Sequence, residues 1–145
     1  VCVMNDGSTD GSVDVVKQFP WVGILSHDRN RGAGAAIRTA HQYALDAGFD
    51  VFGLVAGNDK DRPVEITERL LPPILDEGYD FVQGSRYLRG GDHGNMPFYR
   101  RIATQIVHPT LFKAITRRWI TDSTNGFRCY RTKLLRDPAS KAQSR

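Results

Sequence analysis

Short apolar runs alternate with amphipathic segments along the first 85 residues of the chain. The apolar runs predict four buried strands, at residues 1–4, 21–26, 51–57 and 79–85. Apolar side chains recur at helical spacing in the intervening segments, 10–19, 34–48 and 64–78. Strands that alternate with helices in this way are typical of an α/β domain with a mostly parallel sheet.

Capping and breaking residues refine the predicted helices. Ser8 and Thr9 precede the first helix and are good N-caps, and Gly48 is expected to end the second helix. Pro72 and Pro73 should kink or split the third helix, because proline lacks the N–H donor that a helix interior uses.

A fourth amphipathic segment occupies residues 97–119, and Pro109 is expected to break it. Basic side chains alternate there with apolar ones, at Arg100, Arg101, Lys113, Arg117 and Arg118. This pattern fits either a helix at a membrane interface or a surface helix packed on the sheet, and the second interpretation is slightly favoured. The following segment, 126–135, is expected to begin as a strand.

Polar, glycine-rich segments follow all four predicted strands, and they read NDGSTDGS, HDRNRGAG, GNDKD and GSRY. Parallel α/β sheets bind their ligands at the carboxyl ends of the strands. Chance would distribute such segments over both edges of the sheet. Their concentration on one edge therefore predicts a binding site there.

Composition describes a globular chain with an uneven charge. Of the 145 residues, 40% are hydrophobic and 25% are charged, and the formal net charge is +4. Residues 1–85 hold 7 Lys or Arg against 13 Asp or Glu, whereas residues 86–145 hold 13 against 3. The basic half indicates a polyanionic partner or a solvated basic face. No nucleic-acid-binding motif is present, and no apolar run approaches the ~20 residues that span a bilayer.

The cysteines and histidines suggest no chemistry of their own. Cys2 and Cys129 are too few for a disulfide framework, and their apolar surroundings predict reduced core residues of an intracellular domain. No Cys/His cluster has zinc spacing. His27 and His108 have no visible Ser or Cys partner, so a hydrolytic triad has little support.

The segment NDGSTDGS, residues 5–12, has the features of a nucleotide-binding loop. Gly7 and Gly11 permit close backbone approach, and the N-terminus of the next helix favours an anion near Ser8. Asp6 can accept hydrogen bonds from a nucleobase or a ribose. A capped turn without any ligand explains the same residues.

The segment NRGAGAAIRTA places Asn30, Gly32 and Gly34 between a strand and a helix, as at the start of a dinucleotide fingerprint. Ile37 occupies the position of the third glycine, so the fingerprint is incomplete. Close packing of the helix against the strand is the alternative explanation of the two glycines.

Asp59 and Asp61 supply two carboxylates in a D-x-D spacing, and Asn58 offers an amide oxygen beside them. Mg²⁺ and Mn²⁺ prefer oxygen ligands and often bridge to phosphates, so this segment is a candidate metal site. The alternative is a solvated charged turn before a helix that starts at Pro63.

Two later segments carry further candidates. Arg86, at the end of the fourth predicted strand, suits bidentate recognition of a phosphate. Asp122, Asn125 and Arg128 surround a glycine turn in TDSTNGFRCY. A local ion pair or a helix cap would explain each of these residues without a ligand.

Taken in order, five segments resemble family 2 glycosyltransferases, especially the branch that transfers sugars to dolichyl or polyprenyl phosphate. They are NDGSTDGS, NRGAGAAIRTA, GNDKDRPVEI, GYDFVQGSRY and TDSTNGFRCYR, and they cover residues 1 to about 135. The resemblance implies a GT-A fold, which is a Rossmann-like α/β sheet flanked by helices. It also implies an inverting transfer of a sugar from a nucleotide-sugar donor.

The resemblance assigns roles to the candidate residues. It places Asp6, with Gly7 and Ser8, at the base or ribose of the donor, and it places Asn30, Gly32 and Gly34 near the diphosphate. Arg86, Arg128 and the TDSTNGFR segment would lie around the transferred sugar and the acceptor, and Asp122 matches the catalytic base of many inverting members.

The chain departs from the family pattern in two places. The family's Asp-x-Asp falls on Ala56 and Asn58, so Asp59 and Asp61 are displaced by three residues. Either the loop is remodelled so that they bind Mg²⁺ or Mn²⁺, or the use of a metal is weakened or lost. The chain also starts after the family's first strand. We therefore expect residues 1–135 to be an N-terminally truncated catalytic domain, inactive alone, with 136–145 as a polar tail.

The resemblance implies a nucleotide-sugar donor and a lipid-phosphate or glycan acceptor, with no nucleic acid as partner. It implies a role in cell-envelope or glycan biosynthesis, in the cytoplasm at the cytoplasmic face of a membrane. Two other functions stay open. One is a non-catalytic nucleotide-sugar binding module, because the displaced aspartates could mark lost chemistry. The other is a nucleotidyltransferase, another α/β enzyme that uses acidic residues and a metal.

Overall fold

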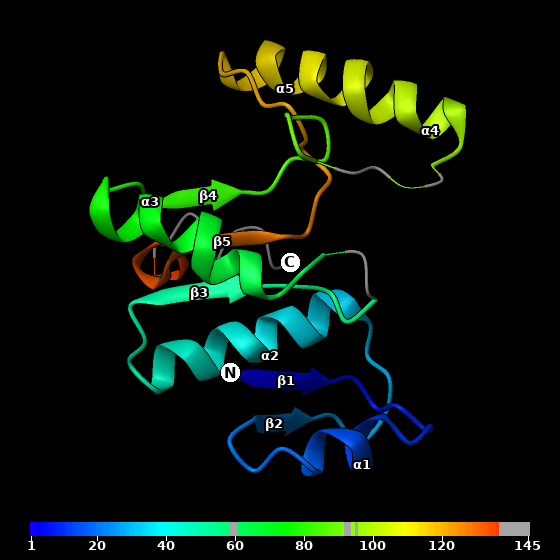
Figure 1. Cartoon of the computed structure of the whole chain (residues 1–145), viewed down its shortest axis with the longest axis vertical. Coiled ribbons are helices and arrows are strands. Elements are labelled where there is room, and N and C mark those ends of the chain that lie inside the picture. Colours follow the sequence, from blue (N-terminus) through cyan, green and yellow to red (C-terminus); the bar gives the residue numbers. More distant parts are fainter. Residues whose placement is uncertain (59–60, 92–93, 95, 137–145) are drawn as a thin grey trace. The chain divides into compact units, whose positions relative to one another are not determined.

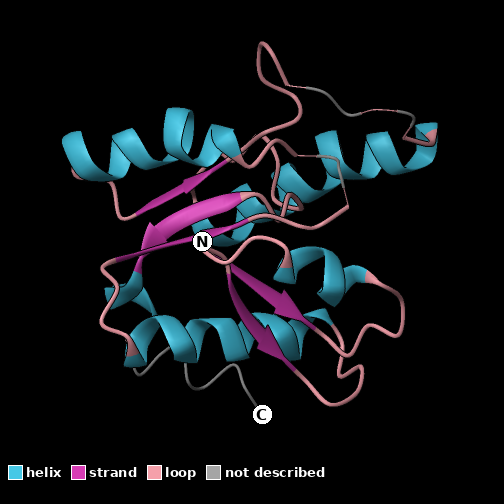
Figure 2. Ribbon diagram, turned by 60° about the horizontal axis from the view of Figure 1, so that its bottom comes forward, coloured by secondary structure: helices cyan, strands magenta, loops and turns pink. Residues whose placement is uncertain are grey.

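A computed structural model describes residues 1–58, 61–91, 94 and 96–136 of the chain. The chain divides into two compact units. The first contains Val1–Phe52 and the segment that begins at Thr132, and the second contains Gly53–Arg131. Strands and helices occur in both units (Figures 1 and 2), which confirms the predicted α/β class.

The first unit is built on a pair of parallel strands. Its elements in chain order are β1 (Cys2–Asn5), α1 (Ser12–Lys17), β2 (Gly23–Ser26), α2 (Ala33–Asp46) and the 3₁₀ turn η3 (Thr132–Leu135). Cys2 lies opposite Gly23, and Asn5 lies opposite Ser26. Helix α2 contacts both β1 and η3. It ends before Gly48, as predicted, where a φ of 72° reverses the backbone.

The second unit contains most of a three-stranded sheet in the order β3-β5-β4. Its elements are β3 (Val51–Leu54, which begins in the first unit), η1 (Ile66–Leu70), α3 (Leu71–Asp76), β4 (Phe81–Gln83), α4 (Phe98–Ile102), η2 (Ala103–Val107), α5 (His108–Thr116) and β5 (Arg128–Arg131). Strands β4 and β5 are antiparallel. The expectation of a mostly parallel sheet is therefore not confirmed. The chain leaves the carboxyl end of β4 and re-enters the sheet beside it, where the Gly84 N–H donates to the Phe127 carbonyl.

Prolines are accommodated inside two helical runs by a widened turn. The Leu71 N–H donates to the Ile66 carbonyl, and the His108 N–H donates to the Ala103 carbonyl, each five residues back. In both runs the next residue is a proline. Because the wider turn has already shifted the hydrogen-bond register, the helix can continue although the proline has no N–H to donate. The predicted break at Pro109 is therefore wrong, because helix continues from Phe98 to Thr116.

The start of α1 also differs from the prediction. Ser8 and Thr9 do not cap this helix, which begins at Ser12 without a side-chain cap. The Ser8 N–H donates instead to Asn5 Oδ1, and the Ser12 N–H donates to Asp10 Oδ1. These side-chain-to-backbone hydrogen bonds hold the segment before Ser12 in turns, so the helix starts later than predicted.

The most buried apolar side chains of the second unit are Leu70, Ile74, Phe127, Cys129 and Tyr130. The Arg131 guanidinium donates to the Ile74 carbonyl at 2.6 Å and so ties β5 to α3. Cys129 is a buried free thiol, as predicted. The same prediction is wrong for Cys2, which is exposed because β1 pairs with β2 alone among the described residues.

Candidate active site

Asp6 joins the two loops that follow β1 and β2 in the first unit. Its Oδ1 accepts a hydrogen bond from the Arg31 N–H at 3.0 Å, and its Oδ2 accepts one from the Gly32 N–H at 2.7 Å. His27 Nδ1 lies 2.7 Å from the same carboxylate. The hydrogen bond from His27, followed by that from the Arg31 backbone, lowers the pKa of Asp6. Asp6 is thus an ionised clamp on the loop before α2.

His27 is part of this clamp, although no motif in the sequence marks it as a site residue. Its side chain is almost fully buried, and Nε2 lies 2.8 Å from the Thr39 hydroxyl of α2. The imidazole therefore bridges the Asp6 carboxylate and helix α2. The only signal in the sequence was its position directly after the second predicted strand, which the structure shows as β2.

Gly7 allows the same two loops to approach each other closely. Its φ is 71°, and a Cβ atom there would lie 2.3 Å from the Arg29 carbonyl carbon and 2.5 Å from the Asn30 nitrogen. This confirms the predicted close backbone approach at Gly7. Gly11 and Gly34 have open space where a Cβ atom would lie, so close packing does not explain them.

A solvent-open hollow lies beside this loop pair. Its volume is about 520 Å³, and it is lined by Ser26, His27, Asp28, Arg29 and Arg31. The two arginines are exposed, so their guanidinium groups can meet an anionic ligand. Asp28 is the one carboxylate of the lining and limits the positive charge of the hollow.

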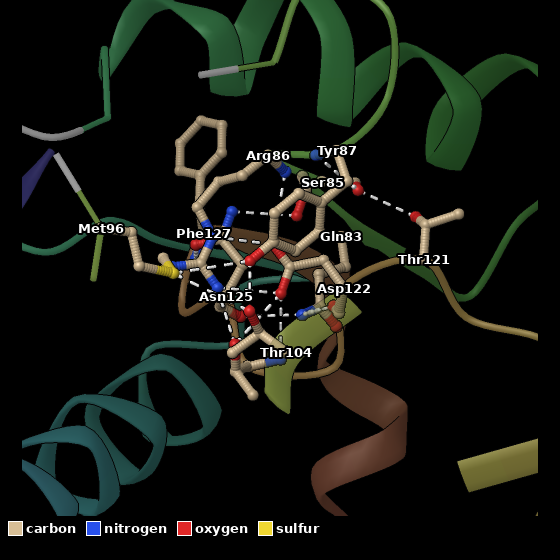
Figure 3. Close-up of polar contacts among 12 residues, drawn as sticks. Gln83, Ser85, Arg86, Tyr87, Met96, Thr104, Thr121, Asp122, Asn125 and Phe127 are labelled. Atoms are coloured by element: carbon tan, nitrogen blue, oxygen red, sulfur yellow. Dashed lines mark hydrogen bonds and ion pairs between the residues drawn. The ribbon is translucent and has the colours of Figure 1, made fainter. Parts of the chain in front are cut away.

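Arg86 and Asp122 form the central ion pair of the second unit (Figure 3). Arg86 Nε donates to Asp122 Oδ2 at 2.7 Å, and Nη2 donates to Oδ1 at 2.9 Å. The Asp122 side chain is 0% exposed, whereas 22% of the Arg86 side chain is exposed. Burial alone would raise the pKa of Asp122, but the hydrogen bonds from Arg86 outweigh it and the pKa is lowered. The carboxylate is therefore ionised and fully engaged.

Several neighbours hold the loop that carries Asp122 in place. Gln83 Nε2 donates to the carbonyl groups of Asp122 and Asn125, each at 2.8 Å. Asn125 Nδ2 donates to the Gly84 carbonyl at 2.9 Å, and the Thr121 hydroxyl donates to Ser85 Oγ at 2.8 Å. These contacts join the end of β4 to the segment before β5. Sequence reasoning missed Gln83, Ser85 and Thr121 as supporting residues. The only signal that could have found them is that each lies close in sequence to Arg86 or Asp122.

The structure gives other predicted site residues contacts within their own segments. Arg128, on β5, donates from Nε to the Gly126 carbonyl at 3.4 Å. Asn30 Oδ1 accepts from the Gly32 N–H and so shapes its own loop. Asn58 is exposed. Asp61 is half-buried and adds a small electrostatic contribution to the raised pKa of Arg86, which its hydrogen bond to Asp122 dominates.

The described residues do not form a metal site. Within residues 1–58, 61–91, 94 and 96–136, no three His, Cys, Asp or Glu side chains gather in a group that could hold a metal ion. Ala56 and Asn58 occupy the two positions at which the sequence resemblance expects an Asp-x-Asp. Of the displaced pair, Asp61 is described and Asp59 lies outside the described residues. Among the described residues, Asn58 and Asp61 are the only oxygen donors of the displaced segment and do not by themselves complete a metal site.

Comparison with known proteins identifies the family. Residues 1–137 match the family described as "Glycosyl transferase family 2", and the chain belongs to that family.

Several curated proteins are similar to this chain over most of its length. Polyprenol monophosphomannose synthase of Mycolicibacterium smegmatis is 29% identical over 140 residues, covering 93% of this chain and 52% of that protein. Undecaprenyl-phosphate mannosyltransferase of Micrococcus luteus is 29% identical over 142 residues, covering 94% and 56%. UDP-N-acetylglucosamine–dolichyl-phosphate N-acetylglucosaminyltransferase of Methanococcus voltae is 22% identical over 152 residues, covering 94% and 60%. The chain thus spans a little over half the length of these relatives.

Proposed function

We propose that this chain is part of an inverting GT-A glycosyltransferase that moves a sugar from a nucleotide-sugar donor to a polyprenyl or dolichyl phosphate. The observation that carries this proposal is the family match over residues 1–137, together with relatives whose names specify such lipid phosphates. In the reaction, an oxygen of the lipid phosphate attacks the anomeric carbon. The bond from that carbon to the donor's diphosphate breaks, and the nucleoside diphosphate leaves with the electron pair.

On the donor side, we propose that Arg29 and Arg31 meet the diphosphate at the hollow beside the first loop pair. Both are arginines on the lining of that hollow, and arginine suits phosphate oxygens. Asp6 would support this role by holding the backbone of Arg31 and Gly32. Contact of Asp6, Gly7 or Ser8 with the nucleobase or ribose stays a prediction.

On the acceptor side, we propose that Arg86 meets the charge of a phosphate and that Asp122 positions Arg86. A lipid phosphate is already an anion near neutral pH, so it needs no strong base. The buried, doubly hydrogen-bonded Asp122 suits positioning better than proton transfer, because both of its oxygens already accept from Arg86. A base role for Asp122 and a direct role for Arg128 stay predictions. Asp61 and Asp59 stay candidates for a metal, and no step here depends on one.

The site of action would be the cytoplasmic face of a membrane, where a lipid phosphate is presented. In the described part of the chain, no helix is both long and apolar enough to cross a bilayer. One specific observation favours the alternative of a non-catalytic binding module, namely the Ala56 and Asn58 that replace the family's aspartates.

Calorimetric titration tests the donor side of this proposal. We expect one of the UDP-, GDP- or dTDP-sugars to bind the protein at its full natural length. Replacing Arg31 with Gln should weaken this binding about tenfold, because a charge-assisted contact with phosphate is lost. Arg69→Gln, which removes another exposed arginine, is the matched control and should leave the affinity unchanged.

The same titration, repeated with and without Mg²⁺ or Mn²⁺, measures the metal requirement. Metal-dependent binding that Asp61→Ala abolishes would assign the displaced carboxylate to the ion. Equal binding in both conditions would describe a metal-independent donor site. Failure of every donor to bind, with or without metal, would overturn the proposed function.

A further inference from the structure

The side chain of His27 is held from both sides. Nδ1 lies 2.7 Å from Asp6 Oδ1, and Nε2 lies 2.8 Å from the hydroxyl oxygen of Thr39 on helix α2. Only 7% of the side chain is exposed, and the His27 N–H donates to the Asn5 carbonyl at 3.0 Å. Because an ionised carboxylate can only accept hydrogen bonds, the proton of the contact with Asp6 is on Nδ1. Both ring nitrogens are therefore engaged within the protein.

Asp6 and His27 hold helix α2 at two levels. At the start of the helix, the Gly32 N–H donates to Asp6 Oδ2 at 2.7 Å, and the Gly32 carbonyl accepts from the Ala36 N–H at 3.1 Å. Thr39 lies about two turns further on, so the two contacts are roughly 10 Å apart along the helix axis. Contacts at this separation fix the direction of the helix as well as the position of its first turn.

The segment between His27 and helix α2 carries both arginines that line the solvent-open hollow. It begins at the His27 side chain, which contacts Asp6 Oδ1, and it ends at the Arg31 N–H, which donates to the same oxygen at 3.0 Å. One carboxylate therefore closes this segment into a short loop, from which Arg29 and Arg31 reach the hollow. A loop that is ordered before its ligand arrives loses less conformational entropy on binding.

The order carboxylate, imidazole and hydroxyl is also that of a hydrolytic triad, but Thr39 does not suit the role of a nucleophile. It lies within the 14-residue helix α2 and is not part of the lining of the hollow. The backbone N–H groups of a helix interior donate to carbonyls of the preceding turn, so those around Thr39 cannot stabilise an oxyanion. The Thr39 hydroxyl is therefore an anchor for the imidazole.

We propose that His27, anchored by Thr39, is a positioning residue for the diphosphate of the nucleotide-sugar donor. It acts through the Asp6 carboxylate, which it directs at the backbone of Arg31 and Gly32, and it thereby holds the two lining arginines ready for the anion. No contact between the imidazole and the donor is required. The inference rests on the proposed function only for the nature of the ligand, because the contacts that carry it lie within the first unit.

Hydrogen–deuterium exchange of the protein at its full natural length tests the positioning without any ligand. In His27→Ala, the backbone amides of Arg31 and Gly32 should exchange roughly tenfold faster, because the carboxylate that accepts from them loses its own partner. The amide of Ala47, at the other end of α2, is the internal control and should exchange as before. His27→Asn should recover most of the protection, since its side-chain amide can donate to the carboxylate near the place of Nδ1.

Calorimetric titration with inorganic pyrophosphate, and with UDP, GDP and dTDP, tests the consequence for the anion. Binding of pyrophosphate and of the preferred nucleotide should weaken about tenfold in His27→Ala and about threefold in Thr39→Val. His27→Asn and Thr39→Ser each restore a hydrogen bond and should recover most of the affinity. In the transfer reaction, His27→Ala should raise the donor KM and leave kcat almost unchanged, as expected for a residue that acts on binding.

Matched controls come from the second unit. His108→Ala removes an exposed histidine, and Thr116→Val removes an exposed helical threonine whose hydroxyl donates to the Phe112 carbonyl of its own helix. Both should bind pyrophosphate as the unaltered protein does. Thermal unfolding of each variant shows whether it is folded at the temperature of the titration.

Two results would overturn the inference. One is unchanged exchange of Arg31 and Gly32 in His27→Ala, and the other is faster exchange without weaker binding, which includes the absence of all binding. If His27→Ala does not fold, unchanged binding in Thr39→Val decides against the inference. Nucleotide binding that depends on His27, without transfer of sugar to a lipid phosphate, would overturn only the proposed function. Sugar transfer with an unchanged donor KM in His27→Ala would overturn only this inference.

Discussion

Asp122→Asn should lower the free energy of unfolding by about 3 kcal/mol at neutral pH, as expected when one partner of a buried ion pair is removed. The Asp122 side chain is fully buried and accepts two hydrogen bonds from the Arg86 side chain. An asparagine has only one side-chain oxygen. Its NH₂ group would either point at the Arg86 guanidinium, which is also a donor, or leave one guanidinium N–H without an acceptor. Chemical denaturation monitored by circular dichroism measures the difference.

The pH dependence of this effect follows from the lowered pKa of Asp122. Burial would raise this pKa, but the hydrogen bonds from Arg86 lower it below the unfolded value of about 3.9. The contribution of the pair is therefore complete above the unfolded pKa and is lost as the pH falls through the folded pKa. The difference in stability between Asp122→Asn and the unaltered protein should shrink as the pH falls below about 4.

A second ion pair of the same unit provides the matched control. Asp80 and Arg131 lie 3.6 Å apart, and both side chains are partly exposed. Asp80→Asn should cost less than about 1 kcal/mol, because solvent screens an exposed pair. An equal loss of unfolding free energy in Asp122→Asn and Asp80→Asn would contradict the larger contribution assigned to the Arg86–Asp122 pair. Full transfer activity in Asp122→Asn would exclude both the base role and the positioning role.

Gly7→Ala should lower the free energy of unfolding by about 3 kcal/mol, through overpacking and an unfavourable backbone conformation. The added Cβ would lie 2.3 Å from the Arg29 carbonyl carbon, and backbone atoms cannot rotate away as a side chain can. The φ of 71° adds strain for any residue with a Cβ. Thermal and chemical unfolding measure this loss.

Gly34→Ala is the matched control for this substitution. Gly34 lies in the first turn of α2, with open space where a Cβ atom would lie. Alanine there should stabilise the chain by up to about 1 kcal/mol, because it favours helix more than glycine does. A Gly7→Ala variant of unchanged stability would show that the two loops can separate freely, and it would contradict the close packing of Gly7 against Arg29 and Asn30.

The strands could be predicted because they depend on local patterns, whereas the contacts of Asp6 with Arg31 and Gly32 could not, because they join residues distant in sequence. Short apolar runs predicted every strand of the described residues near its observed position, and the glycine after the first strand predicted the close backbone approach at Gly7. His27 was missed because its partners, Asp6 and Thr39, are distant in sequence. A histidine with no motif around it does not reveal which distant residues it contacts.

Other features depend on the path of the chain in space. The pairing of Arg86 with Asp122 joins residues 36 positions apart and depends on the antiparallel return of β5, which the strand-helix alternation did not predict. The helix through Pro109 depends on a shifted hydrogen-bond register, which a residue pattern does not reveal. The exposure of Ile115 depends on which side of its helix meets the rest of the unit, and an amphipathic pattern alone leaves two choices.

Transfer of labelled sugar to polyprenyl phosphate is the reaction that the proposed function requires of this protein. The protein at its full natural length would be incubated with sugar-labelled UDP-, GDP- and dTDP-sugars and polyprenyl phosphate in detergent, and the organic phase would be counted. We expect label from one donor to enter the lipid, with loss of that activity in Arg86→Gln and its retention in Asp80→Asn. Donor binding without labelled lipid would indicate a binding module, and transfer of the nucleotide in place of the sugar would indicate a nucleotidyltransferase. Either result would contradict transfer of a sugar to a lipid phosphate as the function of this protein.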